Sequence, residues 1–470
     1  MLRWVHKCMD NIRQSIRKIR SFKSLSECLD HISLDLLGRI AYFLAIIWVL
    51  VPLFLMVISL FYDRSSFFSF MFNSSKLSTI RYVIMQQIGY LGLIITMIII
   101  LKSFRQKKLN HVPLKTYVYS HLVEILLISF LGWSFIASLF SENINLSFYG
   151  TDYRKDGWLS YLAYSGFFGL GYVVFKNRHI TSILRVFVIV GTILSLLLLI
   201  NHPTLNEIFT FYQKSTVFYN PNHMGYYLVL VILSAAYLAV INKGSSMIKI
   251  IDHLVFAILV LALIENGSFG PYIAVSVALI FLVIMTWIKH KEHLIQVISI
   301  PVLFFIVTFV MNLNTQFLFK EATNLQQGIG DIIENNEDAG SAGSGRWSLW
   351  THSLTFMMEK PIFGYGIENL EQAYLEEGIS QDRPHNEFIQ VGANTGMIGL
   401  ILYVSAIAIL YLDFFKIKRK NQMLIVNFYV IITGYFVSAF FGNSMYYTTP
   451  YFMIFMGLSR ALMKSENTDL

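Results

Sequence analysis

The feature that most constrains this chain is a series of apolar runs, each about 20 residues long, which is the length of helix that crosses a bilayer. Of the 470 residues, 55% are hydrophobic and only 14% are charged, whereas soluble domains carry about 25% charged residues. The mean hydropathy is +0.58. We therefore predict an all-α, polytopic membrane protein.

Twelve apolar spans are expected. They lie at 38–62, 80–101, 117–140, 158–175, 180–200, 221–242, 248–265, 269–289, 294–313, 388–412, 423–442 and 446–463. The chain then divides into a basic segment (1–37), spans one to nine (38–313), a large loop with short amphipathic helices (314–387), spans ten to twelve (388–463) and a tail (464–470). In the fourth span, Gly166, Gly169 and Gly171 predict close packing against other helices.

The charges of the loops predict the orientation of the spans. If the N-terminus is cytoplasmic, the cytoplasmic loops hold the basic residues, as the positive-inside rule requires. These residues are Lys102, Arg105, Lys107, Lys108, Lys115, Lys176, Arg178, Lys243, Lys289, Lys291, Lys416, Lys418, Arg419 and Lys420. The loop 314–387 has twelve acidic and four basic residues and falls outside. Both termini are expected in the cytoplasm.

The N-terminal segment 1–37 is basic, and its apolar side chains recur at helical spacing from Val5 to Ile19. We interpret it as a helix on the inner membrane surface, held by anionic lipid; a solvated helix is the alternative. The basic residues behind the net charge of +8 gather in this segment and in the cytoplasmic loops, where membrane orientation requires them. Nucleic acid is therefore not an expected partner. Cys8 and Cys28 both lie here, which excludes a disulfide framework across the fold.

The stretch from Gly345 to Gly399 carries most of the functional information. Arg346 begins an amphipathic helical pattern with Trp347, Trp350, Leu354 and Met358 on one stripe. Pro361 stops that helix, and Gly364 and Gly366 permit a sharp turn. Asn386 is the expected N-cap of the next apolar helix. With Arg383 and His385 beside it, this helix N-terminus is a natural anion site.

These motifs resemble those of the O-antigen ligase and O-antigen polymerase family of bacterial membrane glycosyltransferases. The matching pieces are Arg346-Trp347, the turn Pro361–Gly366 with Asn369 behind it, and His385-Asn386 followed by Gly396 and Gly399. The resemblance covers the chain from about Gly150 onward. It implies a GT-C-like fold in a bacterial plasma (inner) membrane and a donor glycan on a polyprenyl diphosphate. It also implies transfer at the outer face, because the motif loops lie there under the predicted orientation.

The resemblance extends to three shorter loops. Arg154, between Gly150 and Gly157, resembles an arginine that faces the family's catalytic cavity; a guanidinium matches phosphate oxygens bidentately, and a snorkelling arginine is the alternative. Asn220, Asn222 and His223 open the sixth span and are candidates to position sugar hydroxyls, with a simple capping turn as the alternative. Ser268 is the candidate in the third loop, where Phe269 replaces the arginine of the family's Ser-Arg-Gly. The missing charge must therefore come from elsewhere.

His385 is the expected catalytic base. A sugar hydroxyl is a poor nucleophile, and a neutral imidazole removes its proton during attack. Nearby arginines disfavour the imidazolium and keep the ring neutral. Arg346 and Arg383 are the expected ligands of the donor diphosphate, together with Arg154. A structural histidine is the alternative for His385, and pairing with the loop's carboxylates is the alternative for the outer-loop arginines Arg346 and Arg383.

The expected function is transfer of glycan repeat units from a polyprenyl-diphosphate donor to an acceptor sugar hydroxyl, with polymerisation preferred to ligation. No metal or other cofactor is expected, since no Asp-x-Asp or HExxH motif occurs and arginines can stabilise the leaving group. A transporter without chemistry is the competing class. It is disfavoured because the spans hold few charged residues, among them Glu124, Arg185 and Asp252. Glu124 and Arg185 are a candidate intramembrane pair.

Overall fold

The computed structural model of the chain describes residues 29, 32–62, 74–109, 113–174, 177–200, 216–241, 245–334, 340–416 and 423–467. Within these ranges every regular element is a helix. The predicted all-α class is therefore confirmed. Most of the predicted amphipathic segment 1–37 lies outside the described residues, as does the end of the tail 464–470.

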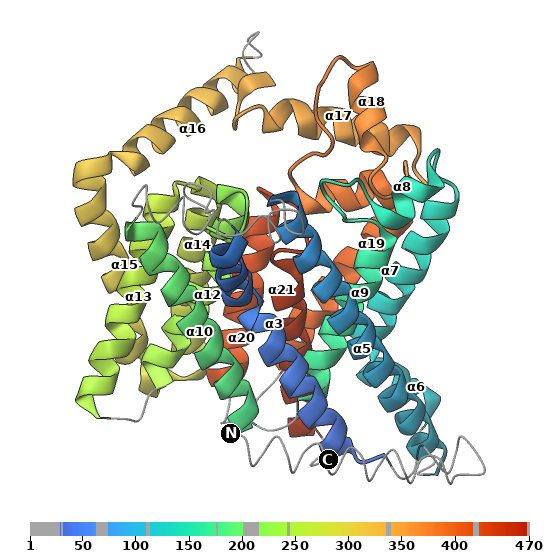
Figure 1. Cartoon of the computed structure of the whole chain (residues 1–470), viewed down its shortest axis with the longest axis horizontal. Helices are drawn as coiled ribbons and strands as arrows, with labels where there is room; N and C mark the ends of the chain where they lie inside the picture. The colour runs from blue at the N-terminus through green and yellow to red at the C-terminus, as the bar shows by residue number, and fades with distance from the viewer. Residues whose placement is uncertain are drawn as a thin grey trace.

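Long helices stand side by side in a bundle (Figure 1). They are α3 (Leu34–Tyr62), α5 (Ser74–Leu109), α7 (Leu122–Leu139), α9 (Trp158–Val173), α10 (Asn177–Ile200), α12 (Pro221–Ile241), α13 (Ser246–Asn266), α14 (Phe269–Lys289), α15 (Leu294–Thr315), α19 (Glu387–Lys416), α20 (Met423–Ala439) and α21 (Thr449–Asn467). The connections include the short helices α6 (Leu114–Ser120), α8 (Ile144–Tyr149) and η1 (Lys291–His293). Each predicted span coincides with one of the long helices.

Nine of the described helices are long and apolar enough to cross a membrane. The three other predicted spans fall on α9 and α20, which have 16 and 17 residues, and on α21, whose last turns carry Arg460 and Lys464. The chain is therefore a multi-pass membrane protein. The total of twelve crossings and the orientation of the termini stay predictions.

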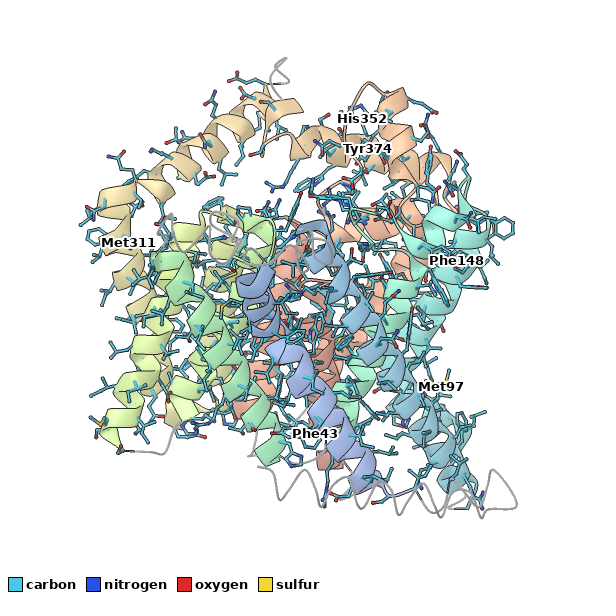
Figure 2. All side chains as sticks on the ribbon, viewed as in Figure 1. Phe43, Met97, Phe148, Met311, His352 and Tyr374 are labelled. Carbon is cyan, nitrogen blue, oxygen red and sulfur yellow. The ribbon has the colours of Figure 1, made fainter. Side chains whose placement is uncertain are left out.

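The predicted loop 314–387 forms a layer of helices, which we call the cap layer. It consists of α16 (Phe317–Ile333), α17 (Arg346–Glu359) and α18 (Leu370–Glu376). Figure 1 shows the cap layer beyond the ends of the bundle helices, at the end opposite α6. In Figure 2, His352 of α17 and Tyr374 of α18 lie in this layer, far from Phe43 of α3.

The apolar stripe predicted on α17 packs only at Trp350, which is partly buried against the cluster around Phe356 and Tyr374. Trp347 and Leu354 are exposed, whereas Leu349 and Phe356 are buried. The cause is the contact with α18, about which the sequence of α17 carries no information. The rings of Phe356 and Tyr374 pack edge to face, with 5.2 Å between their centroids. Contact with α18 therefore determines which face of α17 packs.

Helix α12 is the central helix of the bundle. Its residues from His223 to Val240 are all buried, and none of its residues is an Asp, Glu, Lys or Arg. A helix that is apolar on every side has no face suited to water. Its uniform composition therefore explains why other helices surround it.

Glycines allow α9 to pack closely against α5 and α21. A Cβ atom at Gly166 would overlap the carbonyl oxygen of Gly89 on α5, and one at Gly171 would overlap that of Ile454 on α21. In lipid, helices associate through such close packing rather than through the hydrophobic effect. The predicted packing role of the α9 glycines is confirmed.

A buried ion network joins three helices near the end of α21 that is remote from the cap layer. Arg460 donates to Glu124 of α7 at 3.1 Å and to Asp413 of α19 at 2.8 Å, and Lys464 lies 3.2 Å from Glu124. The predicted pair of Glu124 with Arg185 is therefore wrong, and Arg185 is exposed. Two cations on α21 satisfy Glu124 inside the bundle, where an unpaired charge would be costly.

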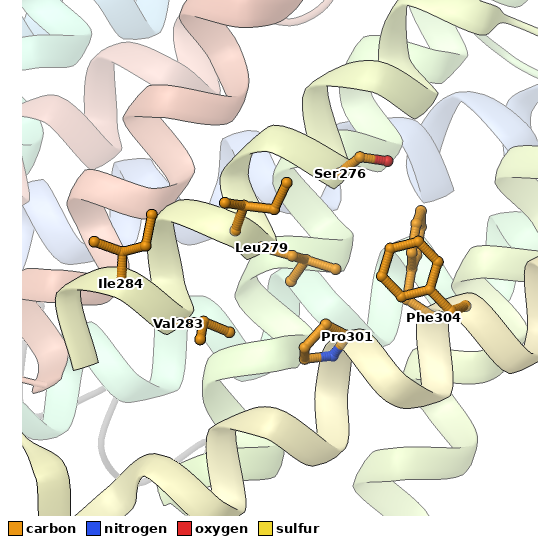
Figure 3. Close-up of a pocket in the computed structure, with 8 residues that line it drawn as sticks. Ser276, Leu279, Val283, Ile284, Pro301 and Phe304 are labelled. Carbon is orange, nitrogen blue, oxygen red and sulfur yellow. The ribbon is translucent and has the colours of Figure 1, made fainter. Parts of the chain in front are cut away.

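An apolar pocket of about 180 Å³ lies between α14 and α15 (Figure 3). The labelled lining residues are Ser276, Leu279, Val283, Ile284, Pro301 and Phe304. No ionisable side chain lines this pocket. The pocket therefore offers no charged group for acid–base chemistry or phosphate binding.

The glycine contacts make a stability prediction. Gly166→Ala should lower the free energy of unfolding by roughly 1–3 kcal/mol, the usual cost of overpacking. Gly132→Ala is the matched control, because a Cβ atom there meets nothing within 4 Å; it should be neutral or stabilise by up to about 1 kcal/mol. Unfolding of both purified variants in detergent, followed by tryptophan fluorescence, tests this. Equal stabilities would contradict the packing argument.

Candidate active site

Loops from five parts of the chain meet at the cap end of the bundle. The contacts run from Arg154 to Asp382, from His385 to Asn443, from Ser444 to Asp156, from Tyr447 to His223 and from Asn266 to Pro221. Four of these loops were singled out from the sequence. The fifth, Phe440–Thr448 between α20 and α21, was not.

The turn Pro361–Gly366 docks on a break in α19. At Gly396 the backbone has φ +70° and ψ −178°, which interrupts the helix. The turn bonds to backbone groups around the break, from Tyr365 N to Ala393 O (2.9 Å), from Gly366 N to Asn394 O (2.9 Å) and from Met397 N to Pro361 O (2.8 Å). A Cβ atom at Gly396 would overlap the carbonyl of Ile362. Only glycine fits this conformation and this approach.

The same segment positions His385. As predicted, Asn386 caps α19: its Oδ1 accepts from Phe388 N at 3.0 Å and from Ile389 N at 3.2 Å. Pro384 is fixed from the cap layer, because its carbonyl accepts from Trp350 Nε1 at 3.0 Å. His385 lies between these anchors with φ +53°. Such strained backbone in a non-glycine residue is characteristic of functional sites.

The surroundings of His385 favour its neutral form. Burial lowers its pKa to about 4, and the positive charges of Arg154, Arg383 and Arg346 act in the same direction. Asn443 Nδ2 lies 3.3 Å from its Nδ1. Since the pKa lies below neutrality, the ring keeps a lone pair at physiological pH. This agrees with the charge state predicted from the sequence.

Arg154 forms a bidentate pair with Asp382. Its Nε and Nη2 donate to the two carboxylate oxygens at 2.7 and 2.9 Å. Burial alone would raise the pKa of Asp382, but the charges of Arg383 and Arg154 outweigh it and lower that pKa to about 2. Arg154 thus lies at the cap end, where it already pairs with a carboxylate of the protein, and its role as a diphosphate ligand stays a prediction.

Arg383 is buried among carboxylates. It bonds to Glu368, lies 3.3 Å from Asp382 and 3.9 Å from Asp156. Burial raises the pKa of Asp156, and the nearby Arg383 charge only partly opposes this. The arrangement matches the alternative weighed for the loop arginines, pairing with carboxylates. Arg383 therefore ties the cap loops to the loop before α9.

Arg346 has the fewest protein partners of the three expected diphosphate ligands. It begins α17 and is half-buried. Its Nη1 donates to Gly343 O at 3.2 Å, and its Nε is buried without a hydrogen-bond partner in the described part of the chain. A guanidinium held only by a carbonyl retains donors for an anion.

The residues expected to position sugars have mainly structural contacts. Asn220 Oδ1 accepts from Asn222 N at 2.8 Å, which fits the capping alternative. His223 is buried, with Nδ1 3.2 Å from Phe218 O and its ring stacked on Tyr447 at 4.9 Å. Ser268 is buried at the start of α14, and its side chain does not cap that helix.

Arg81 was missed by sequence reasoning. It lies near the start of α5 and is fully buried, with Nη2 donating to Tyr447 O at 3.1 Å. Its guanidinium lies 4.4 Å from the Phe218 ring and 4.8 Å from the Tyr447 ring. Among the described residues, no carboxylate forms an ion pair with Arg81. A charge within an apolar run was the available signal, since such charges mark functional positions.

The loop Phe440–Thr448 was also missed. Its polar residues Asn443 and Ser444 reach His385 and Asp156. The available signal was a polar run, Gly-Asn-Ser, between two apolar spans. In the described ranges, no group of three or more His, Cys, Asp or Glu side chains is placed to hold a metal ion. The expectation of metal-free chemistry stays a prediction.

The fold and the cap-end cluster define a polytopic membrane protein with an ionisable site at one end of its helix bundle. Residues 254–404 match the family model described as O-Antigen ligase, a match that covers about a third of the chain and supports an assignment to the O-antigen ligase and polymerase family. The matched range includes Arg346, the Pro361–Gly366 turn and His385, but not Arg154. No curated protein matches the chain. The family supports glycan transfer of the O-antigen ligase and polymerase type, with lipid-linked glycan substrates.

The buried position of Arg383 predicts a large structural effect. Arg383→Met leaves Glu368, Asp382 and Asp156 without their shared cation and should cost roughly 3–5 kcal/mol of unfolding free energy, as for other broken buried pairs. Lys360→Met is the control, because its pair with Glu142 is exposed and should be worth about 1 kcal/mol or less. Thermal unfolding in detergent is the measurement. Equal losses in the two variants would exclude a supporting role for the Arg383 cluster.

Proposed function

We propose that this protein transfers polysaccharide repeat units from an undecaprenyl-diphosphate-linked donor to an acceptor sugar hydroxyl, at the outer face of a bacterial plasma membrane. The observation that carries the proposal is His385, a neutral imidazole held in strained backbone beside a helix N-terminus and near three arginines. The family match supports the reaction type. The products would be a longer glycan and a free lipid diphosphate.

In this proposal His385 is the general base. It removes the proton of the acceptor hydroxyl as that oxygen attacks the anomeric carbon of the donor, and the glycosidic C–O bond to the diphosphate breaks. Positioned general bases contribute about 10²–10⁴-fold to rate. The arginines stabilise the negative charge that develops on the diphosphate oxygen, because they lie in a partly buried, low-dielectric place.

The three arginines are proposed to have different roles. Arg346 is the main ligand of the diphosphate, because it has no carboxylate partner among the described residues. Arg154 is a second ligand that must share its charge with Asp382. Arg383 acts indirectly, because its ion pair with Glu368 holds the loop that carries His385. Arg346 is also proposed to supply the positive charge that the α13–α14 hairpin lacks, because that hairpin has Phe269 where the family has an arginine.

Polymerisation of repeat units, as for a capsule or exopolysaccharide, is the preferred outcome, and ligation of a finished glycan to a different acceptor is the alternative. Both use the same donor and base. A non-catalytic transporter of lipid-linked glycans is disfavoured, because the ionisable residues cluster at the cap end and in one balanced network at the other end. A membrane-crossing path would need polar groups between these two ends.

Removal of the base should abolish transfer but leave the donor bound. His385→Ala is expected to lower turnover roughly 10²–10⁴-fold, which corresponds to about 3–5 kcal/mol of barrier. The control is His352→Ala, since His352 is held by Ser348 O within α17 and should not affect turnover. The assay uses purified protein and a lipid-linked glycan. Full activity of His385→Ala would disprove the assignment of the base.

Loss of Arg346 should weaken both donor binding and turnover, because a guanidinium on diphosphate acts in the ground state and in the transition state. Lys320→Ala on exposed α16 removes the same charge away from the site and is the control. Wild-type activity should persist in EDTA. Unchanged donor affinity in Arg346→Ala, or loss of wild-type activity in EDTA, would contradict this part of the mechanism.

The pKa of His385 sets the expected pH dependence. Since the pKa is about 4, the ring is already deprotonated at neutral pH, and turnover limited by this group should stay constant down to about pH 5. It should fall as pH drops through the pKa, when the imidazole gains a proton and loses its lone pair. A pH profile of turnover checks this. A fall centred near the ordinary histidine value, about 6.5, would contradict the buried, arginine-flanked environment.

A further inference from the structure

The contact between Asn443 and His385 has a consequence for which ring nitrogen acts as base. Asn443 is buried, and its side-chain amide meets Nδ1 of His385 at 3.3 Å. The other amide atom, Oδ1, is buried with no hydrogen-bond partner in the described part of the chain. Among the described residues, no hydrogen-bond partner meets Nε2 of His385, and the residue is only half-buried. Nε2 is therefore the nitrogen available to a substrate.

The loop that carries Asn443 is fixed by its own contacts. Phe441 O accepts from Tyr226 at 2.7 Å, and Met445 N donates to Thr449 Oγ1 at 2.8 Å. Ser444 Oγ lies 3.5 Å from a carboxylate oxygen of Asp156. Contacts with α12, α21 and the loop before α9 thus hold the amide of Asn443 next to His385. A side chain anchored in this way can orient an imidazole ring.

A neutral imidazole has one N–H and one lone pair, so the partner of Nδ1 decides the state of Nε2. If the amide nitrogen faces Nδ1, it donates there, and Nε2 carries the proton and cannot be a base. A half-turn of the amide brings Oδ1 to Nδ1 instead. Oδ1 then accepts from Nδ1–H and is no longer unpartnered, and the Nε2 lone pair is free.

We propose that Asn443 is a positioning residue that accepts the Nδ1 proton of His385 through Oδ1 and leaves Nε2 as the base for the acceptor hydroxyl. This rests on the proposed function of His385. The proton of the hydroxyl moves to Nε2, and the imidazolium that forms keeps its Nδ1–H bond to the uncharged amide. Asn443 does not itself gain or lose a proton.

Two substitutions at Asn443 separate a positioning role from a merely structural one. Asn443→Leu keeps the volume but accepts no hydrogen bond, and should lower kcat roughly 10–100-fold, the usual effect of losing an orienting partner, with KM for the donor unchanged. Asn443→Asp still accepts from Nδ1–H, so kcat at neutral pH should recover to within about tenfold of wild type. Its carboxylate favours the imidazolium, so the acid limb of the kcat profile should move to higher pH.

Asn324→Asp is the matched control, because it adds the same charge at an exposed position of α16 and should leave the acid limb unmoved. An acid limb in Asn443→Asp at the wild-type position, or equal kcat in Asn443→Leu and Asn443→Asp, would overturn the inference. Loss of activity in His385→Ala together with either result would reject Asn443 while retaining the proposed base.

Histidine-selective 15N NMR of the purified protein at pH 7 tests the tautomer without an activity assay. The His385 signal is identified by its absence in His385→Ala. The Nδ1–H tautomer is expected in the wild type and its loss in Asn443→Leu. An Nε2–H tautomer in the wild type would overturn the inference, whether or not His385 proves to be the base.

Discussion

The cap end of the structure depends on one interruption in a helix. At Gly396 the backbone of α19 leaves the helical conformation, and the turn Pro361–Gly366 bonds to the backbone on both sides of the break. Irregular backbone in a membrane protein must find such partners. The docked turn fixes α17 above it and the short helical piece Glu387–Thr395 beside it. The N-terminus of that piece is where His385 lies.

Buried charges complete the arrangement. Arg383 and Arg154 are matched by Asp382, Glu368 and Asp156, so the loops before α9 and before α19 are joined by ion pairs of low exposure. Within this network both arginines disfavour a proton on His385. The same groups therefore stabilise the loop packing and keep the imidazole basic. The cost is that two of the arginines near His385 are already paired, and Arg346 is left with the most unused donors.

Much of the fold could be predicted because its signals are local. The apolar runs coincide with helices, Asn386 caps α19, and the small residues of α9 pack as expected. The candidate site was predicted only in part. His385, Arg154 and Arg346 come to the same end of the bundle, but the sequence did not indicate which carboxylates pair with Arg154 and Arg383. The pairs Arg154–Asp382 and Arg460–Glu124 join residues 228 and 336 positions apart, and such pairs leave no local pattern in the sequence.

The sequence by itself determined where helices form, because helix formation in lipid depends on the length and apolarity of each run. It also determined which loops carry chemical groups. Only the tertiary structure decided which face of α17 packs, that Arg460 satisfies Glu124, and that Asn443 meets His385. These contacts join residues from 18 to 336 positions apart. Which of these contacts form depends on the distances between packed helices, and no single segment of the sequence encodes those distances.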